Sequence, residues 1–420
     1  MQPHQASTPT IQHSHTVDSS DIEARARLFA GYLSPAELAQ VRQRMLEHAG
    51  DWLELIEQAT AYMVAGTAPQ DATMQELARR WAALFRASYA GDDYALDGKV
   101  RKAFCREPGL LANIDIGLAA FMQRALMHLY PLPGIQDGTS DESPKPSAWM
   151  TATLRAAHQL LDVPLILDDP LALKIMGSVR EVELRANPGR HRNPYSDAMR
   201  VTLAVRSRLA EDSWLQAMHN GMRQYVILGA GLDTFAYRAG ATSDTRLFEV
   251  DLPSTQCWKR ACLRAAGIAE PASLHYVATD FTHTTLGQAL AASGFDPGLP
   301  ATFSWLGVTM YLSEEDVMQT LRYVAACSPG SCIVFDYLIK PELLTPIERT
   351  GQEMMAEALA AQGEALHSYF DPPTLEQSLR QLGFGKIEHF GPEKLSEQYL
   401  SGRSDGLCLS GILHMIRATV

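Results

Sequence analysis

The sequence predicts a mixed α/β chain in two parts: an all-helical N-terminal region followed by a doubly wound α/β sheet. Apolar residues recur every three or four positions up to about residue 130. Beyond about residue 220, short apolar runs alternate with helical segments. The chain has 420 residues, of which 46% are hydrophobic and 20% charged, so it is longer than one ordinary core requires. We therefore expect two globular domains.

The helical region, residues 21–130, has its clearest helix start at Ser34. Ser34 and Glu37 are spaced as a capping box, in which each side chain accepts a hydrogen bond from the other residue's amide. Pro35 stands at the first helical position, where its missing amide is tolerated. The apolar stripe behind this cap predicts one helix that ends at Gly66. Two further amphipathic segments follow with no strand pattern between them, so this domain should be all-α.

Two stretches have no apolar periodicity. Residues 1–20 are rich in His, Gln, Ser and Thr, which predicts a disordered tail. Residues 131–148 concentrate Pro, Gly, Ser and acidic residues, which is typical of a linker. The second domain should therefore occupy residues 149–420.

Charge and cysteine usage exclude several classes of function. The net charge of -12 gives no attraction to nucleic acid. Six cysteines without a CxxC pair are typical of reduced thiols in a cytoplasmic protein, and neither they nor the histidines have the spacing of a metal site. No apolar run approaches the roughly 20 residues of a membrane helix. We expect neither nucleic acid, metal nor membrane as a partner.

The second domain has five apolar runs with the length and composition of buried strands. They lie at residues 224–228, 246–250, 275–278, 301–305 and 331–337. Helical segments separate them, as in a parallel sheet. Ligands of such sheets bind beyond the carboxyl ends of the strands.

The first run leads directly into Gly229-Ala230-Gly231, and glycines there let the backbone pass close to a ligand. Asp251 ends the second run, 20 residues after Gly231, where an acid can bind two ribose hydroxyls. Glu249 is the alternative ribose ligand, and the alternative role of Asp251 is as a simple cap of the helix that follows. The loop therefore predicts a nucleoside site.

The nucleoside is not expected to be a dinucleotide. Thr234 stands where GxGxxG has its third glycine, so the pyrophosphate fingerprint of an NAD-dependent oxidoreductase is missing. The third run leads to Asp280 and Phe281, an acid and an aromatic ring suited to the amine and the face of adenine.

Four runs in the second domain, RQYVILGAGLDT, FEVDLP, TDF and SWLGVTMYL, resemble the motifs of the leucine carboxyl methyltransferase-like family in their order and approximate spacing. The similarity covers about residues 149–340. Family members are class I methyltransferases, so the resemblance implies S-adenosylmethionine as cofactor. It also implies a Rossmann-like, mostly parallel, seven-stranded sheet.

The motif match implies a role for individual residues. Arg206, in AVRSRLAED, would pair with the methionine carboxylate, although its pattern also fits an exposed helix position. Gly229, Ala230 and Gly231 would pass beneath the methionine, and Asp251 would bind the ribose. Asp280 and Phe281 would flank the adenine.

The acceptor side departs from part of the family. Eukaryotic leucine carboxyl methyltransferases have a glutamate before the small residue of the fourth motif, whereas Leu306 precedes Gly307 here. The sequence therefore resembles the bacterial branch, and a phosphatase tail is not the expected acceptor. Tyr195 and Tyr311 are the candidate contacts to the acceptor.

The helical region resembles the TipAS thiopeptide-recognition domain over about residues 25–130. The similar runs are LSPAELAQVRQRM, LARRWAALFRASYAGD and REPGLLANIDIGLAAFMQRAL. That family has an all-α, globin-like fold, so the resemblance implies a domain that recognises a ligand or substrate.

These observations favour an S-adenosylmethionine-dependent O-methyltransferase acting on a small molecule or peptide in bacterial secondary metabolism. A carboxylate acceptor is favoured because it is already ionised, whereas a hydroxyl acceptor needs a base that no spacing identifies. The alternative is a catalytically inactive small-molecule sensor on the same scaffold. The sequence leaves the oligomeric state open.

Overall fold

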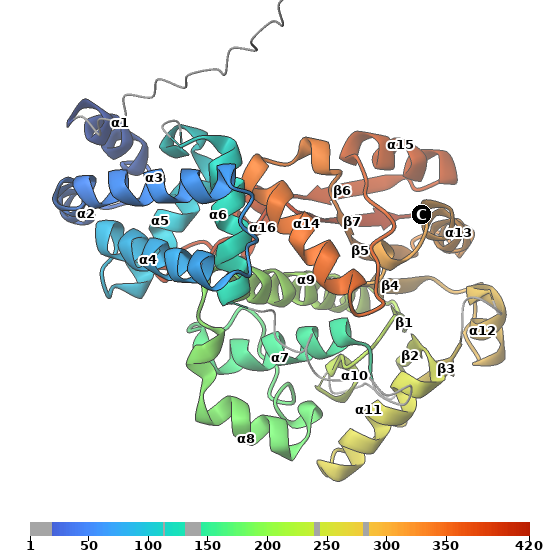
Figure 1. Ribbon diagram of the computed structural model, residues 1–420. Coiled ribbons are helices and arrows are strands. Elements are labelled where there is room, and N and C mark those ends of the chain that lie inside the picture. The colour runs from blue at the N-terminus through green and yellow to red at the C-terminus, as the bar shows by residue number, and fades with distance from the viewer. Residues whose placement is uncertain (1–18, 112–113, 131–143, 239–243, 280–284) are drawn as a thin grey trace, which may run out of the picture. The chain divides into compact units, whose positions relative to one another are not determined.

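The computed structural model describes residues 19–111, 114–130, 144–238, 244–279 and 285–420 (Figure 1). The chain divides into two compact units, residues 1–126 and 127–420, here called the N-terminal unit and the sheet unit. The predicted tail lies outside the described residues as far as residue 18. The predicted linker lies outside them over 131–143, and its last residues already belong to helix α7.

The N-terminal unit is helical throughout its described residues. Its helices are α1 (Ser19–Phe29), α2 (Pro35–Glu47), α3 (Ala49–Val64), α4 (Ala72–Tyr89), α5 (Tyr94–Arg106) and α6 (Ile116–Leu129). Phe29 is fully buried at the centre of their apolar core. The rings of Tyr89 and Phe104 lie 5.8 Å from it, a distance typical of favourable aromatic pairs. The prediction of an N-terminal all-α domain agrees with this unit.

The capping box at the start of α2 forms as predicted, but the helix is shorter than expected. The Ser34 side chain accepts from the Glu37 amide, and the Glu37 carboxylate accepts from the Ser34 amide at 2.8 Å. The prediction of one helix as far as Gly66 is wrong, because the chain leaves helical geometry at His48. Gly50 follows closely, and glycine is a poor helix former. The apolar stripe continues across this break, so periodicity alone did not reveal it.

The sheet unit contains a seven-stranded sheet in the order β3-β2-β1-β4-β5-β7-β6. Its strands are β1 (Gln224–Leu228), β2 (Arg246–Asp251), β3 (Leu274–Ala278), β4 (Ala301–Trp305), β5 (Cys332–Leu338), β6 (Lys386–Phe390) and β7 (Leu413–Thr419). The first five are parallel, and β7 pairs antiparallel with both neighbours. This confirms the predicted mostly parallel α/β sheet. The two last strands had no clear signal in the apolar pattern.

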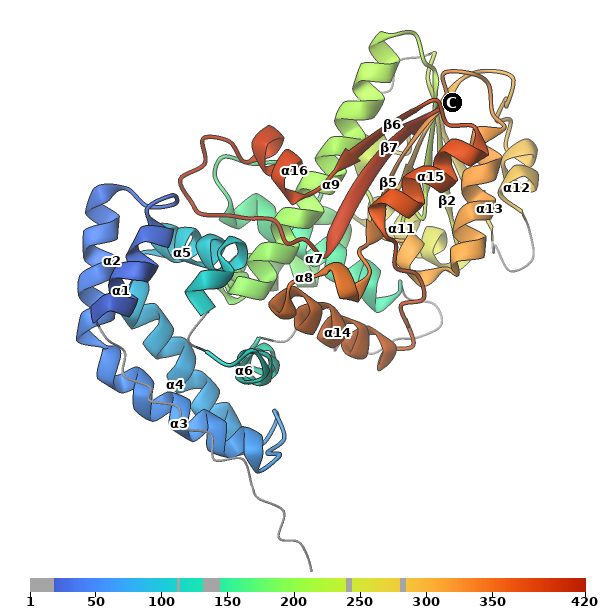
Figure 2. The same cartoon turned by 90° about the horizontal axis from the view of Figure 1, so that it is seen from above.

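Helices cover both faces of this sheet. They are α7 (Pro146–Leu161), α8 (Ser178–Ala186), α9 (Pro194–His219), α10 (Phe235–Arg238), α11 (Pro253–Ala265), α12 (Leu286–Ala292), α13 (Glu314–Ala325), α14 (Pro346–Ala360), α15 (Pro372–Leu382) and α16 (Pro392–Tyr399). Figure 2 shows α9 on one side of the strands and α13 and α15 on the other. Within the described residues, no helix is long and apolar enough to cross a bilayer.

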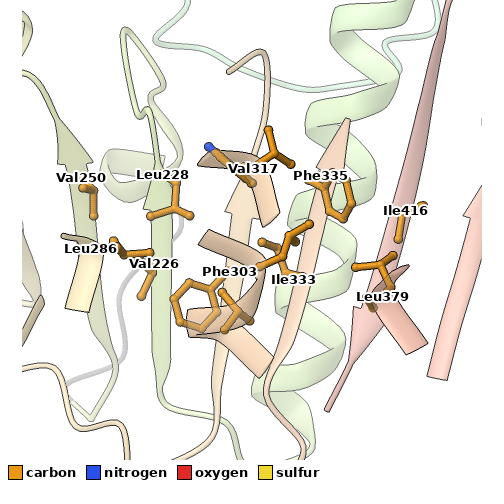
Figure 3. Packing of buried hydrophobic residues seen from close by; sticks show 14 of the residues in the cluster. Val226, Leu228, Val250, Leu286, Phe303, Val317, Ile333, Phe335, Leu379 and Ile416 are labelled. Carbon is orange, nitrogen blue, oxygen red and sulfur yellow. The ribbon is translucent and has the colours of Figure 1, made fainter. Parts of the chain in front are cut away.

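The main core lies between the sheet and helices α12, α13 and α15. Val226, Phe303 and Ile333 from three neighbouring strands are fully buried there and pack with Val317 of α13 and Leu379 of α15 (Figure 3). Each such side chain contributes about 1.5–3 kcal/mol when it is removed from water. This core fixes the strands, and therefore the loops that leave their carboxyl ends.

The strand order reverses direction between β1 and β4. The chain proceeds outward from β1 to β2 and β3, then returns to place β4 on the other side of β1. Open α/β sheets bind their ligands beyond the carboxyl ends of the strands, at the point where the strand order reverses. The functional residues are therefore expected beyond the carboxyl ends of β1 and β4.

We expect the two units to unfold separately, because the described core clusters lie within one unit or the other. Phe29→Ala should destabilise the N-terminal unit by about 3–5 kcal/mol through loss of buried ring contacts. Hydrogen–deuterium exchange should then accelerate in α1, α4 and α5 and stay unchanged in β1 and β4. The matched control is Val64→Ala at an 81% exposed site, which should alter neither. Faster exchange across the sheet in Phe29→Ala would contradict this independence.

Candidate functional site

The glycine loop after β1 packs against the loop after β4. Gly229 has φ +66°, and a Cβ added there would lie 2.3 Å from Cγ2 of Val308. No side chain fits that space, and the left-handed backbone disfavours one as well. Gly231 has φ +45°, and Ala230 between them is buried. The predicted glycines therefore allow a close approach of the two loops at the point where the strand order reverses.

Asp251 faces this loop from the end of β2. Its carboxylate accepts hydrogen bonds from the Gly231 amide at 2.5 Å and from the Leu252 amide at 2.7 Å. The next helix begins with Leu252 as its N-cap and without a side-chain cap, so Asp251 is not a conventional helix cap. Burial raises the pKa of Asp251, while its two backbone hydrogen bonds act in the opposite direction. The site thus has a carboxylate that orders the glycine loop.

Glu249, the alternative ribose ligand, has one carboxylate oxygen in a buried ion pair, and its Oε1 has no hydrogen-bond partner among the described residues. It is fully buried, and its Oε2 lies 2.8 Å from Nζ of Lys259, which is also buried. Burial raises the pKa of Glu249 to about 7, against the effect of Lys259. A buried ion pair of this kind supports the strand beneath Asp251, and Asp251 is the better placed acid for a ligand.

Arg206 is not a surface residue. It lies on α9 with 8% exposure, and its Nη1 is 2.8 Å from Oδ2 of Asp336 on β5, which is fully buried. Oδ1 of Asp336 accepts from the Gly307 amide at 2.7 Å. A Cβ at Gly307 would lie 2.8 Å from Nη2 of Arg206, so the guanidinium rests on the backbone of the loop after β4. This places a positive charge beside the loops that meet at Gly229.

A buried ionic network anchors the end of the glycine loop. Arg155 of α7 pairs with Asp169 at 2.8 Å and with Asp233 at 3.0 Å. The Thr234 hydroxyl donates to Asp169 at 2.7 Å. Arg238 reaches the same carboxylate at 3.2 Å. Thr234, which stands where a dinucleotide-binding loop has its third glycine, is therefore a buried residue that hydrogen-bonds to Asp169. This contact explains why the chain has a threonine there and lacks the GxGxxG fingerprint.

Tyr311 lies just after β4 in the 3-10 turn η4 (Thr309–Tyr311). Its hydroxyl is hydrogen-bonded to the Ser147 side chain, and the charges of Arg206 and Asp336 influence its pKa. Burial raises that pKa to about 12. The Ser147 hydroxyl donates to Glu364 at 2.7 Å, and its amide donates to the same carboxylate at 2.9 Å. A chain of three polar groups therefore borders the site.

Tyr195, the other candidate acceptor contact, lies far from this cluster. It stands 11 residues before Arg206 on the same helix, which is about 16 Å along the axis at 1.5 Å per residue. Its ring packs 6.4 Å from that of Tyr130. Asp280 and Phe281 lie outside the described residues. Among the residues that the structure describes, no group of three or more His, Cys, Asp or Glu side chains could hold a metal ion.

Sequence reasoning missed Asp336, Ser147 and Glu364. Asp336 lies inside an apolar strand, and a lone acid in the run CIVFDYL was the one available signal. Ser147 was assigned to the linker, and Glu364 follows α14 without a motif. Their roles arise from contacts between residues far apart in the chain, which local patterns do not record.

The comparisons with known proteins agree with this geometry. The family model described as leucine carboxyl methyltransferase matches residues 148–325. YktD of Bacillus subtilis, provisionally named an S-adenosyl-L-methionine-dependent methyltransferase, is 31% identical over 291 residues, which are 64% of this chain and 95% of YktD. The chain belongs to the leucine carboxyl methyltransferase family. It is therefore an S-adenosylmethionine-dependent methyltransferase, as the sequence motifs predicted.

Two solved structures are similar over large parts of the chain. A Bordetella parapertussis protein, provisionally described as exported, covers 97% of both chains at 15% identity with a TM-score of 0.42. A Thermobifida fusca protein, provisionally described as a methyltransferase, covers 69% of this chain and 98% of its own at 16% identity with a TM-score of 0.40.

The residues beyond the carboxyl ends of the central strands fit S-adenosylmethionine. The cofactor has an amino-acid carboxylate, which suits the buried guanidinium of Arg206, and a ribose, which suits the carboxylate of Asp251. The Val308 side chain packs directly on the backbone of Gly229, so the glycine brings the loops after β1 and β4 close together beside these two groups. Gly229 lies where the strand order reverses, Asp251 binds the same glycine loop from the end of β2, and Arg206 of α9 rests on the loop after β4.

Replacing Asp251 with Ala should weaken S-adenosylhomocysteine binding by about 1–3 kcal/mol, because buried hydroxyl groups would lose their partner. Asp244→Ala is the matched control, since this acid precedes the same strand but its side chain is 58% exposed in a pair with Arg223. Calorimetry should show wild-type affinity for the control. Unchanged affinity in Asp251→Ala would remove the ribose role from this residue.

Proposed function

We propose that this methyltransferase is an O-methyltransferase whose acceptor is a carboxylate of a small molecule or peptide. Methyl transfer from a sulfonium is an in-line displacement, so the protein has to align acceptor and methyl group and exclude water. When bound, S-adenosylmethionine supplies the electrophilic methyl group. The chain's own residues supply cofactor binding and acceptor orientation.

For the cofactor, we propose a residue-by-residue assignment. Arg206 binds the methionine carboxylate through a charge-assisted pair. Gly229, Ala230 and Gly231 let the backbone pass close to the methionine, and Asp251 accepts from the ribose hydroxyls. Asp280 and Phe281, which follow β3 in the sequence, complete the set at the adenine.

The observation that carries the carboxylate assignment is the state of Tyr311. A tyrosine is protonated at neutral pH in any case, and burial, which raises the pKa of Tyr311 to about 12, keeps it so to higher pH; its hydroxyl therefore serves as a hydrogen-bond donor to the acceptor when its proton turns from Ser147. A neutral donor suits an acceptor that is already an anion. The description of the family as leucine carboxyl methyltransferase supports the same acceptor class. Leu306 in the fourth motif, partly buried against α9, favours an acceptor other than a phosphatase tail.

A hydroxyl acceptor is the second candidate, and the chain of polar groups favours it. A hydroxyl must lose its proton during transfer, which requires a base. In this case the acceptor hydroxyl gives its proton to the Tyr311 oxygen, Tyr311 gives its own proton to the Ser147 oxygen, and Ser147 gives its proton to the Glu364 carboxylate, which is the base. The two candidates differ in whether Glu364 matters for turnover.

We further propose that the N-terminal unit recognises the acceptor, as its TipAS resemblance implies. A groove of about 380 Å³ between α3 and α4 has a size suited to part of a small ligand. Leu55 and Leu84 supply its apolar lining, and His48, Asp51 and Arg80 supply polar groups. A cytoplasmic enzyme of bacterial secondary metabolism fits this combination of a recognition domain and a methyltransferase domain.

Tyr311→Phe should lower kcat/KM for a carboxylate acceptor roughly 10- to 100-fold, the effect of losing one hydrogen bond to a charged group. S-adenosylhomocysteine affinity should stay within twofold. The assay is release of S-adenosylhomocysteine across a panel of carboxylic acids and phenols. In wild type, turnover of a carboxylate should be flat from about pH 6 to 9, since the acceptor ionises near pH 4 and Tyr311 titrates near 12.

Glu364→Gln separates the two acceptor classes. A carboxylate acceptor should keep its rate within a few-fold, because no proton has to be removed. A hydroxyl acceptor should lose about 10²–10⁴-fold through loss of the base. Exclusive turnover of phenols, abolished in Glu364→Gln, would replace the carboxylate proposal with the hydroxyl one.

A further inference from the structure

Among the described residues, Arg206 forms one ion pair, with Asp336. The proposed cofactor contacts do not include Asp336, so its role needs a separate explanation. Asp336 lies in the middle of β5, a strand whose seven residues are all buried. Its exposure is 0%, and a carboxylate buried this completely costs several kcal/mol unless each oxygen has a partner. Both oxygens have one, and the two partners come from different elements.

The first partner is the guanidinium. Nη1 of Arg206 lies 2.8 Å from Oδ2 of Asp336, which ties α9 to β5. The second partner is the backbone amide of Gly307, 2.7 Å from Oδ1, which ties the loop after β4 to the same carboxylate. The backbone carbonyl of Asp336 also accepts from the Thr309 hydroxyl at 2.6 Å. Asp336 therefore fixes both a side chain and the loop on which that side chain rests.

The guanidinium has a defined orientation as a result. Nη1 is held by Asp336, while Nη2 faces Gly307, where a Cβ would come within 2.8 Å. An arginine without such a partner would lose side-chain conformational entropy when it bound a ligand carboxylate, because several of its bonds would become fixed. An arginine held beforehand avoids that loss, which is the basis of affinity through preorganisation.

We propose that Asp336 is a positioning residue for the cofactor: it holds Arg206 and the Gly307 loop in the arrangement that receives the methionine carboxylate. This inference rests on the proposed role of Arg206. Asp336 would not touch the cofactor itself. Its contribution should therefore be confined to ligands that carry the amino-acid carboxylate.

Two ligands separate this role from a general structural one. S-adenosylhomocysteine has the carboxylate, and 5′-methylthioadenosine lacks it but keeps the adenine, the ribose and the sulfur. Calorimetry of the full chain with each ligand gives an affinity ratio. Asp336→Asn should weaken S-adenosylhomocysteine binding about 10- to 100-fold and change 5′-methylthioadenosine binding less than twofold.

The matched control is Asp212→Asn. Asp212 pairs with Arg208 on the same helix at the same N–O distance, 2.8 Å, but with partly exposed side chains. The control should keep both affinities, because an exposed pair contributes little. Loss of S-adenosylhomocysteine affinity in Asp212→Asn as well would overturn the assignment to Asp336.

A second variant covers the case in which Asp336→Asn does not fold, since removing one partner leaves the other charge buried. The double variant Arg206→Met/Asp336→Leu replaces the pair with apolar residues, a change that proteins often tolerate. It should bind 5′-methylthioadenosine like wild type and S-adenosylhomocysteine no more weakly than Arg206→Met alone, because Asp336 acts only through Arg206.

Equal weakening of both ligands, or an unchanged affinity ratio in either variant, would overturn the positioning role. Failure of the wild type to bind S-adenosylhomocysteine would be a different result. It would reject the proposed cofactor site as a whole, so the two proposals can fail separately.

Discussion

The close packing of the loops that leave β1 and β4 is the constraint on which the site depends. Val308 occupies the space that a side chain at Gly229 would need, and Arg206 occupies the space beside Gly307. Both glycines also have positive φ, which other residues rarely adopt. Each contact therefore requires a glycine backbone beneath a neighbouring side chain, and this occurs where the strand order reverses. The geometry gathers amide groups, a guanidinium and a carboxylate around the ends of β1 and β4.

Buried charges hold this arrangement in place. A carboxylate inside a protein must be paired, and breaking such a pair costs about 3–5 kcal/mol. Helix α9 takes part repeatedly: Arg206 pairs with Asp336, Glu211 pairs with Arg238 beyond the glycine loop, and Arg200 pairs with Asp162. One 26-residue helix thus connects β5 to the loops around the cofactor site. This explains why Arg206, in a pattern that also fits a surface position, lies buried.

The sequence revealed those features that depend on neighbouring residues. The capping box at Ser34, the first five strands and the glycine loop follow from local spacing. Features that depend on distant contacts were missed or misjudged: the break at His48 lies within a continuous apolar stripe, and Asp336 and Glu364 have no motif of their own. Thr234 was identified as a missing glycine, but its bond to Asp169 became evident only from the structure. Strands β6 and β7 lack the long apolar runs of a doubly covered strand; β6 is the edge strand, β7 is its neighbour, and several of their residues are only partly buried.

A crystal structure of the chain with S-adenosylhomocysteine would show whether these loops bind the cofactor. We expect the amino-acid carboxylate within about 3 Å of a guanidinium nitrogen of Arg206, which is a normal charge-assisted distance. We also expect both ribose hydroxyls on Asp251, with the Arg206–Asp336 pair still 2.8 Å apart. A ligand bound away from the end of β1, or an Arg206 side chain that turns from the ligand while the pair persists, would contradict this assignment.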